Sequence, residues 1–349
     1  MQKWKALGIM SGSSLDGLDL ALSEYTLNQE KWSFKILHRD SIELPDNLKE
    51  LLKTSTSLSG EDLVLLDITY GKWIASQLGD FLADYPKPDV VGLHGHTVFH
   101  KPDLGYSLQI GSADHVAASV SCPVVSNFRQ KNIALGGQGA PLVPIGDFHL
   151  FNDFDACVNL GGICNTTLLN RQDLLAWDIS ACNQVFNFLA HEMGQAFDKD
   201  GVIALSGSLD EDLLQALNRL SYYDLKAPKS IGNHWVKENF IPLVQRAKSS
   251  VPDKMHTVQR HLVDRICTEL KSYGVKKALL TGGGAHNANF VQRLRDQGDI
   301  EFIVPEKQIV DFKEAIIFGF LALLRILCKE NILSSYTNSK FNLSGGSIS

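Results

Sequence analysis

The chain has 349 residues, a hydrophobic content of 44%, a charged content of 21% and a formal net charge of −6. This length exceeds what a single hydrophobic core usually supports, so two domains are expected. The negative balance argues against a nucleic-acid or anionic-membrane surface, for which a basic stripe would be expected.

Neither a leader nor a membrane span is expected. The chain does not open with a basic segment followed by an apolar stretch, and its most apolar run, residues 315–328, is shorter than the ~20 residues that a span needs. The six cysteines are scattered without a CxxC pair, which favours free thiols over disulfides or a zinc site. These features predict a cytoplasmic protein.

The first half of the chain alternates strands with helices. Strands are expected over residues 3–10, 17–24, 31–44, 89–93, 107–111 and 123–127. Helical periodicity dominates residues 45–85 and 113–120, with Ser59 placed to begin a helix. The glycines of residues 136–139 then predict an irregular loop, where the chain could pass between domains.

The second half repeats the theme with which the first half opens. Strands are expected over residues 156–160, 163–170, 174–179, 277–280 and 301–304, and long helices over 255–273, 287–297 and 311–328. A strand, a glycine turn and a returning strand open each half. This pattern predicts two similar α/β domains.

The turn near the start of the chain carries the first chemical signal. Residues 8–19 run from an apolar strand through glycines and the hydroxyls of Ser13 and Ser14 into a second strand. Glycines let backbone N–H groups approach an anion, and Asp16 would repel a phosphate unless a divalent metal lay between them. The turn therefore predicts a cradle for nucleotide phosphates and Mg²⁺, although an ordinary tight hairpin has the same pattern. It matches neither the Walker nor the Rossmann motif.

Glycine turns follow apolar strands at three places, residues 12, 161 and 282. In a two-domain α/β chain, three such turns favour a nucleotide held in an interdomain cleft by backbone N–H groups.

Histidines and carboxylates add further candidates, each with two interpretations. His94, His96 and His100 alternate along an extended segment and could ligate a metal, but histidines that line a substrate loop are at least as common. Asp178 ends an apolar strand and is either an exposed terminus or a general base. Glu314, at the start of the last helix, is either a partner of the helix dipole or a site residue.

The motifs taken together resemble those of the anhydro-N-acetylmuramic acid kinases, within the actin/hexokinase/Hsp70 ATPase superfamily. The resemblance rests on GIMSGSSLDGLD (8–19), HGHTVFHKP (94–102), LQIG (108–111), FRQKNIALGGQGAPLVP (128–144), NLGGICN (159–165), FDKDG (197–201), PKSIG (228–232), TGGGAHN (281–287) and DFKEA (311–315). These segments occur in the family's order and span nearly the whole chain.

The resemblance implies a fold and a reaction. Two actin-like (ribonuclease H-like) domains, residues 1–127 with about 313–349 and residues 128–312, would enclose a nucleotide cleft, and the last helix would return to the first domain. ATP and Mg²⁺ would serve a kinase that opens a 1,6-anhydro sugar with water and phosphorylates O6, in cell-wall recycling. A homodimer is a further family expectation.

The resemblance also assigns roles to individual residues. Asp178 would be the general base, and Glu314 a second acidic group that orients the water or the sugar. The first phosphate loop would comprise Gly12, Ser13, Ser14, Leu15, Asp16, Gly17, Leu18 and Asp19, with Asp16 directed towards Mg²⁺ through water. The second loop would comprise Asn159, Gly161, Gly162 and Asn165, and the nucleoside site Gly282, Gly283, Gly284 and Asn287. The sugar would meet His94, His96, Thr97, Arg129, Gln138 and Asn183, with Arg129 on the lactyl carboxylate.

The chain departs from the family pattern at three places. Residues 179–182 lack the usual glycines, Asn127 replaces a common aspartate, and Asn233 and His234 replace an Arg-Glu pair. These changes leave open a related kinase of another sugar. A third alternative, an Hsp70- or actin-like binding protein that uses ATP, would need an additional domain for which the chain has no spare residues.

Overall fold

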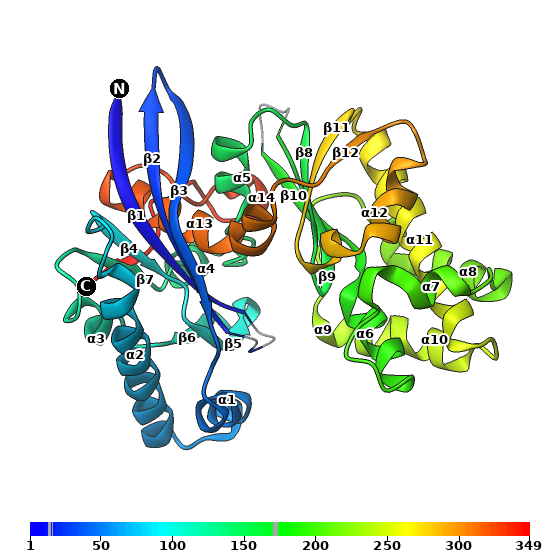
Figure 1. The fold of residues 1–349 in the computed structure, drawn as a ribbon, viewed down its shortest axis with the longest axis horizontal. Helices are drawn as coiled ribbons and strands as arrows, with labels where there is room; N and C mark the ends of the chain where they lie inside the picture. The colour runs from blue at the N-terminus through cyan, green and yellow to red at the C-terminus, as the bar shows by residue number, and fades with distance from the viewer. Residues whose placement is uncertain (13–14, 16, 170–173) are drawn as a thin grey trace. The chain divides into compact units, whose positions relative to one another are not determined.

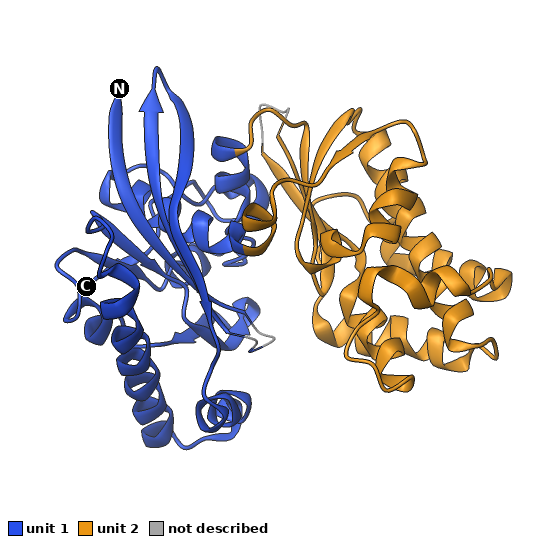
Figure 2. Ribbon diagram, in the orientation of Figure 1, with its two compact units in different colours: residues 1–150, 312–349 blue, residues 151–311 orange. Residues whose placement is uncertain are grey.

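The computed structural model describes residues 1–12, 15, 17–169 and 174–349. The chain forms two compact units, residues 1–150 with 312–349 and residues 151–311 (Figure 2). Among the described residues, no helix combines the length and the apolar character that a bilayer crossing requires. All six cysteines are free, and Cys328 is exposed to solvent.

The sheet of the first unit has the strand order β13-β7-β4-β1-β2-β3 (Figure 1). Its first three strands form an antiparallel meander, while β4 and β7 continue parallel to β1. The strands are β1 (Gln2–Ser11), β2 (Leu18–Asn28), β3 (Lys31–Ile42), β4 (Val90–Leu93), β7 (Val124–Ser126) and β13 (Ser347–Ile348).

A separate hairpin and several helices complete this unit. The hairpin pairs β5 (His96–Lys101) with β6 (Tyr106–Ile110). The helices are α1 (Asp46–Lys53), α2 (Gly60–Leu82), α3 (Ala113–Ala117), α4 (Gln130–Ala134), α5 (Pro144–Leu150) and α14 (Ser334–Thr337), with most of α13 (Lys307–Ile326). The predicted start of α2 is confirmed, since Ser59 accepts a hydrogen bond from the Asp62 N–H at 3.1 Å.

The last long helix, α13, packs directly on the sheet of the first unit. Two glycines permit the contact, because a Cβ on Gly8 would lie 1.6 Å from the Ala315 carbonyl oxygen and one on Gly92 would lie 2.1 Å from that of Phe318. Ile316 and Phe320 are fully buried. The apolar run of the sequence is therefore a buried helix, and residues 312–349 belong to the first unit.

The sheet of the second unit has the strand order β10-β9-β8-β11-β12. Here too an antiparallel meander of three strands is followed by two parallel ones. The strands are β8 (Ala156–Leu160), β9 (Ile163–Leu168), β10 (Leu175–Ala181), β11 (Lys277–Thr281) and β12 (Glu301–Ile303). Both units thus have the same strand order in their first five strands, which confirms the predicted duplicated α/β fold of actin-like type.

Helices cover the sheet of the second unit. They are α6 (Asn183–Glu192), α7 (Val202–Ser206), α8 (Glu211–Asn218), α9 (Asn233–Trp235), α10 (Ile241–Arg246), α11 (Val251–Ser272) and α12 (Ala288–Arg295). The longest, α11, begins with a capping box between Ser250 and Asp253. Its buried face includes Val258, Leu262 and Ile266, which join the core of the unit, as the helical spacing predicts.

The first unit extends further along the chain than the sequence suggests. It continues to residue 150, whereas the predicted boundary was at 127. Two contacts hold the additional segment in this unit: Arg129 donates a hydrogen bond to His94, and Asp147 forms an ion pair with Lys313. The loop at residues 136–139 therefore lies within the first unit and is not the passage between units.

Candidate functional site

The first glycine turn connects β1 to β2. The last pair of the ladder is Ser11 with Leu18, and within the turn the Leu15 N–H donates to the Gly12 carbonyl oxygen at 3.2 Å. Gly17 lies close to the strand β3, because a Cβ there would be 3.0 Å from the Ile42 carbonyl oxygen. Three residues of the predicted phosphate loop, Ser13, Ser14 and Asp16, lie outside the described residues.

The carboxylate of Asp19 follows this turn, in the second residue of β2. Its Oδ1 accepts a hydrogen bond from the Ser41 hydroxyl at 2.7 Å. Asp19 also contributes to the field at Glu314, where it acts to raise the pKa of that carboxyl. The structure therefore places the end of the turn and Glu314 in one electrostatic environment.

His94 and Arg129 form a hydrogen-bonded pair in the first unit. The ring Nδ1 of His94 lies 2.7 Å from the Gly95 carbonyl oxygen, and its Nε2 lies 2.9 Å from Nη2 of Arg129. Nη1 of Arg129 donates to the Gly139 carbonyl oxygen at 2.8 Å, while its buried Nε has no hydrogen-bond partner in the described part of the chain. Burial, followed by the Arg129 charge, lowers the pKa of His94 to about 3. His94 is therefore neutral, and Nε2 is its acceptor.

The other two histidines of the cluster do not complete a metal site with His94. Gly95 has a positive φ of 76°, and the register of β5 shifts between Thr97 and Phe99, so the simple alternation expected for this segment is broken. No group of three His, Cys, Asp or Glu residues suited to a metal occurs in the described ranges. His96 and Thr97 lie in the strand β5, although a loop was predicted.

Gln138 is exposed in the glycine loop that precedes the cis Ala140–Pro141 bond. The loop is organised by Asn132, which is fully buried. The Asn132 side chain accepts from the Gly139 N–H at 2.8 Å and donates to the Thr337 hydroxyl at 2.9 Å. Asn132 thus positions Gly139, whose carbonyl oxygen accepts the hydrogen bond from Arg129.

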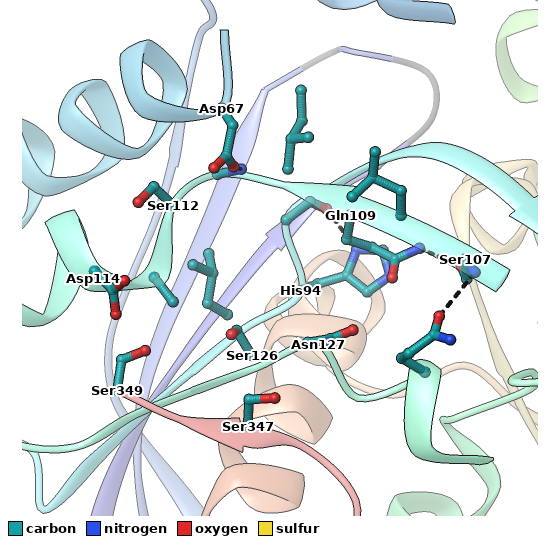
Figure 3. Close-up of a pocket in the computed structure, with 17 residues that line it drawn as sticks. Asp67, His94, Ser107, Gln109, Ser112, Asp114, Ser126, Asn127, Ser347 and Ser349 are labelled. Atoms are coloured by element: carbon teal, nitrogen blue, oxygen red, sulfur yellow. Dashed lines mark hydrogen bonds between the residues drawn. The ribbon is translucent and has the colours of Figure 1, made fainter. Parts of the chain in front are cut away.

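A polar pocket of about 340 Å³ lies beside His94 in the first unit (Figure 3). Its lining includes His94, Gln109 and Asn127, and the amide of Gln109 donates to the hydroxyls of Thr97 and Ser107. Of the six predicted sugar-binding residues, His94 alone lines this pocket.

Glu314 lies in the eighth position of α13, because the helix begins at Lys307. It is therefore too far from the helix start to act as the N-terminal dipole partner considered above. Its side chain is accessible to solvent, yet enough protein surrounds it that desolvation raises the pKa of the carboxyl, against the opposing effects of Lys313 and Arg129. Lys313 is itself paired with Asp147 at 2.8 Å, with both side chains almost fully buried.

In the second unit, predicted phosphate and nucleoside residues lie side by side. The ladder pairs Asn159, near the end of β8, with Thr281 at the end of β11. A Cβ on Gly282 would lie 2.5 Å from Asn159 Oδ1, and one on Gly284 would lie 2.8 Å from the Cβ of Leu160. Only glycine permits these approaches, so the two loops form one surface.

Side chains from neighbouring helices support this surface. Asn183, at the start of α6, donates to the Leu160 carbonyl oxygen at 2.8 Å, and the Gln184 N–H donates to the Gly162 carbonyl oxygen at 3.2 Å. Asn287 caps α12 by accepting from the Phe290 N–H at 2.9 Å. Of the remaining predicted loop residues, Gly161 lies beside the Asn159 amide, Gly283 begins the 3₁₀ turn Gly283–His286, and Asn165 is paired with Asp178 across the sheet.

Asp178 lies within β10, although the sequence suggests that it ends the strand. The ladder between β9 and β10 shifts register between Asp178 and Ser180, so a β-bulge falls at this position. Bulges re-aim side chains and are frequent beside active sites. The carboxyl is partly accessible, and burial raises its pKa despite hydrogen bonds from the Ile231 N–H and the Ser230 hydroxyl.

Several structurally important residues of the two units have no clear signal in the sequence. Asn132 and Glu269 look like ordinary polar residues of a helix, and the buried pair of Asp147 and Lys313 joins distant segments. Ser230 does lie in a recognised motif, PKSIG, but the motif alone gives it no role.

The duplicated sheet topology, with a glycine turn in the opening hairpin of each unit, defines an actin-like fold, a class that includes sugar kinases. The family model for anhydro-N-acetylmuramic acid kinase matches residues 4–348, and the chain belongs to this family. It is accordingly an ATP-dependent phosphotransferase.

Two curated relatives agree with this assignment. The anhydro-N-acetylmuramic acid kinase of Sulfurimonas denitrificans is 33% identical over 92% of each chain. That of Mannheimia succiniciproducens is 33% identical over 100% of this chain and 99% of its own. Among solved structures, component A of the Acidaminococcus fermentans (R)-2-hydroxyglutaryl-CoA dehydratase aligns with a TM-score of 0.47 and 11% identity, over 91% of this chain and 97% of that one.

Proposed function

We propose that the protein opens 1,6-anhydro-N-acetylmuramic acid by attack of water on the anomeric carbon and transfers the γ-phosphate of ATP to the freed O6. The product is N-acetylmuramic acid 6-phosphate, and the role is cell-wall recycling. The environment of Asp178 carries the proposal: one carboxyl oxygen is anchored by two hydrogen bonds, and the side chain remains partly accessible.

Asp178 is the general base in this reaction. It takes a proton from the attacking water as the new C1–O bond forms and the C1–O6 bond breaks, and O6 then receives the phosphoryl group. Burial raises the pKa of the carboxyl, which increases its basicity. Glu314, whose pKa burial also raises, orients the water or the sugar.

Arg129 recognises the lactyl carboxylate of the sugar. Its two terminal nitrogens are fixed by His94 and the Gly139 carbonyl, and its Nε keeps a free donor. A guanidinium held in this way is preorganised for a carboxylate. The other sugar contacts are assigned to His94, His96, Thr97, Gln138 and Asn183.

ATP binds through backbone donors of the glycine turns in residues 12–19, 159–165 and 282–287. The transferring phosphate needs positioning and cations more than covalent catalysis. Mg²⁺ would supply that charge, and Asp16, which lies outside the described residues, is the protein group assigned to it. The protein would act as a homodimer, which light scattering would test.

The deciding experiment follows the oxygen of water. The protein is incubated with ATP, Mg²⁺ and 1,6-anhydro-N-acetylmuramic acid in ¹⁸O-labelled water, beside Asp178→Asn and the exposed control Asp212→Asn. We expect one ¹⁸O at C1 of a 6-phosphorylated sugar and none in the phosphate, with turnover lost only in Asp178→Asn. Phosphorylation of a sugar with a free 6-hydroxyl, without ¹⁸O in the sugar, would instead identify a kinase of another sugar.

A further inference from the structure

Asp178 is held by its backbone as well as by its side chain. Its N–H donates to the Lys229 carbonyl oxygen at 3.0 Å, and its own carbonyl oxygen accepts from the Tyr222 hydroxyl at 2.5 Å. Both partners come from the segment that precedes α9, outside the sheet. The ladder with β9 is irregular just after Asp178: Asp178 pairs with Asn165, and the register then shifts before Ser180 pairs with Cys164.

The two oxygens of the Asp178 carboxyl have different surroundings. Oδ2 accepts from the Ser230 hydroxyl at 2.8 Å and from the Ile231 N–H at 2.9 Å. Within the described residues, no hydrogen bond reaches Oδ1. The carboxyl therefore has one anchored oxygen and one that is available to a water molecule.

Glu269 of α11 connects the two segments that meet at Asp178. Its Oε2 accepts from Trp177 Nε1 at 2.7 Å, and its Oε1 accepts from Lys229 Nζ at 2.6 Å. The side chains of this ion pair are 15% and 3% exposed, respectively, so solvent screens it weakly. The Lys229 ammonium also lies 4.8 Å from the centre of the Tyr222 ring. One carboxylate thus ties the residue before Asp178 to the residue before Ser230.

We propose that Ser230 is a positioning residue that holds Oδ2 of Asp178 and leaves Oδ1 to receive the proton of the attacking water, and that Glu269 keeps Ser230 in place. This inference rests on the proposed role of Asp178 as the base. It adds a residue that sets the direction and the proton affinity of that base.

The effect of removing the Ser230 hydroxyl on the pKa of Asp178 depends on the other groups around this carboxyl. The titratable groups that face it are Cys164 of β9, Tyr222 of the 3₁₀ turn Ser221–Asp224, Glu269 of α11 and Lys229. Burial raises the pKa of Tyr222, so its hydroxyl stays a neutral donor. The Lys229 charge is already matched by Glu269. The Ser230 hydroxyl is therefore a donor that stabilises the ionised carboxylate and that can be removed without changing a charge.

The test is the pH profile of kcat/KM for Ser230→Ala and Ser230→Thr beside the wild type. Loss of a donor to the carboxylate raises the pKa of Asp178, and the acid limb should move to higher pH by about half a unit to one unit. kcat should fall more than tenfold, with KM for the sugar changed less than threefold. Ser230→Thr keeps the hydroxyl and should restore the wild-type limb.

Two further variants separate positioning from stability. Ser206→Ala removes an exposed hydroxyl that bonds to the Ile203 carbonyl in the same unit, and it should leave the limb unchanged. Glu269→Gln removes the charge that anchors Lys229 and should lower kcat, with a lower unfolding midpoint as well. Because Ser230 is exposed, Ser230→Ala should unfold close to the wild-type temperature.

Each outcome bears on one proposal at a time. If Asp178→Asn loses turnover, while Ser230→Ala leaves the acid limb of the kcat/KM profile where it is in the wild type, the role of Ser230 is wrong and the base assignment stands. If Asp178→Asn keeps wild-type turnover, the base assignment itself fails. The inference is supported if the acid limb of the kcat/KM profile shifts to higher pH in Ser230→Ala and lies at the wild-type pH in Ser230→Thr.

Discussion

His94 accepts a hydrogen bond from Arg129, with 2.9 Å between Nε2 and Nη2. The other ring nitrogen faces the Gly95 carbonyl, so its proton is on Nδ1 and the ring carries no charge. Arg129 therefore keeps its full positive charge for a ligand. A neutral acceptor orients the guanidinium without competing with an incoming carboxylate, whereas an acidic residue in the place of His94 would cancel its charge.

Arg129→Lys should weaken sugar binding strongly. A lysine keeps the charge, but its single nitrogen cannot bond to both His94 and Gly139 and still offer two parallel N–H donors to the carboxylate of the sugar. We expect KM for the anhydro sugar to rise at least tenfold, with a smaller change in kcat, in steady-state assays at saturating ATP. The exposed Arg246→Lys serves as the matched control. An unchanged KM in Arg129→Lys would exclude a bidentate role for this side chain.

Two buried histidines should make the fold sensitive to mild acid. Burial lowers the pKa of both His94 and His261 to about 3, below the unfolded value near 6.5. Between these values the unfolded chain binds more protons than the folded one, so the free energy of unfolding falls as pH drops from 6.5 towards 3. Each histidine contributes up to about 1.4 kcal/mol per pH unit.

Urea unfolding between pH 4.5 and 7.5 tests this dependence. His261 bonds to Asn218 through Nδ1 and to the Tyr223 hydroxyl through Nε2, and glutamine can keep part of this pairing. His261→Gln should therefore reduce the pH dependence of the free energy of unfolding near pH 5 by the equivalent of about one bound proton. His191→Gln, on the exposed side of α6, should alter this dependence much less. Parallel curves for wild type and His261→Gln would show that folding does not lower the pKa of His261.

Local patterns in the sequence were enough to predict most of the fold. Glycine turns between apolar strands predicted both opening hairpins, and the Ser59 pattern predicted the start of α2. The last helix was predicted from its apolar run, but its first turn was missed. The helix begins at Lys307, in a polar stretch that has no apolar periodicity. Glu314 is therefore the eighth residue of the helix and does not lie in its first turn, where it was predicted.

Features that depend on distant contacts could not be predicted in this way. The register shift beside Asp178 and its hydrogen bonds with residues 229–231 depend on segments distant from β10, and no local pattern in the sequence of β10 indicates them. The boundary at residue 150 depends on pairs such as Asp147 with Lys313, which are 166 residues apart. The glycine turns indicated a phosphate cradle by themselves, and Asp178 and Glu314 each had two interpretations until the family resemblance favoured one; these roles remain predictions.

The buried pair of Lys313 and Asp147 should be a major contributor to the stability of the first unit. Their side chains are 4% and 3% exposed, and the pair joins α13 to α5. Lys313→Met removes the cation and leaves a buried carboxylate, which typically costs about 3–5 kcal/mol. Urea unfolding should show this loss, with partial recovery in Lys313→Met/Asp147→Asn. No recovery in the double variant would show that Lys313 acts through packing alone.

Gly8→Ala should displace α13 and thereby reduce both stability and turnover. The added Cβ would fall 1.6 Å from the Ala315 carbonyl oxygen, which is backbone and can move only if the helix moves. Ala315 adjoins Glu314, so the shift should lower kcat as well as the unfolding midpoint. Gly79→Ala in α2 is the matched control, because a Cβ there meets nothing within 4 Å and alanine favours a helix by about 0.5–1 kcal/mol. If Gly8→Ala unfolds like the wild type and keeps its kcat, the close contact between α13 and β1 is not required for catalysis.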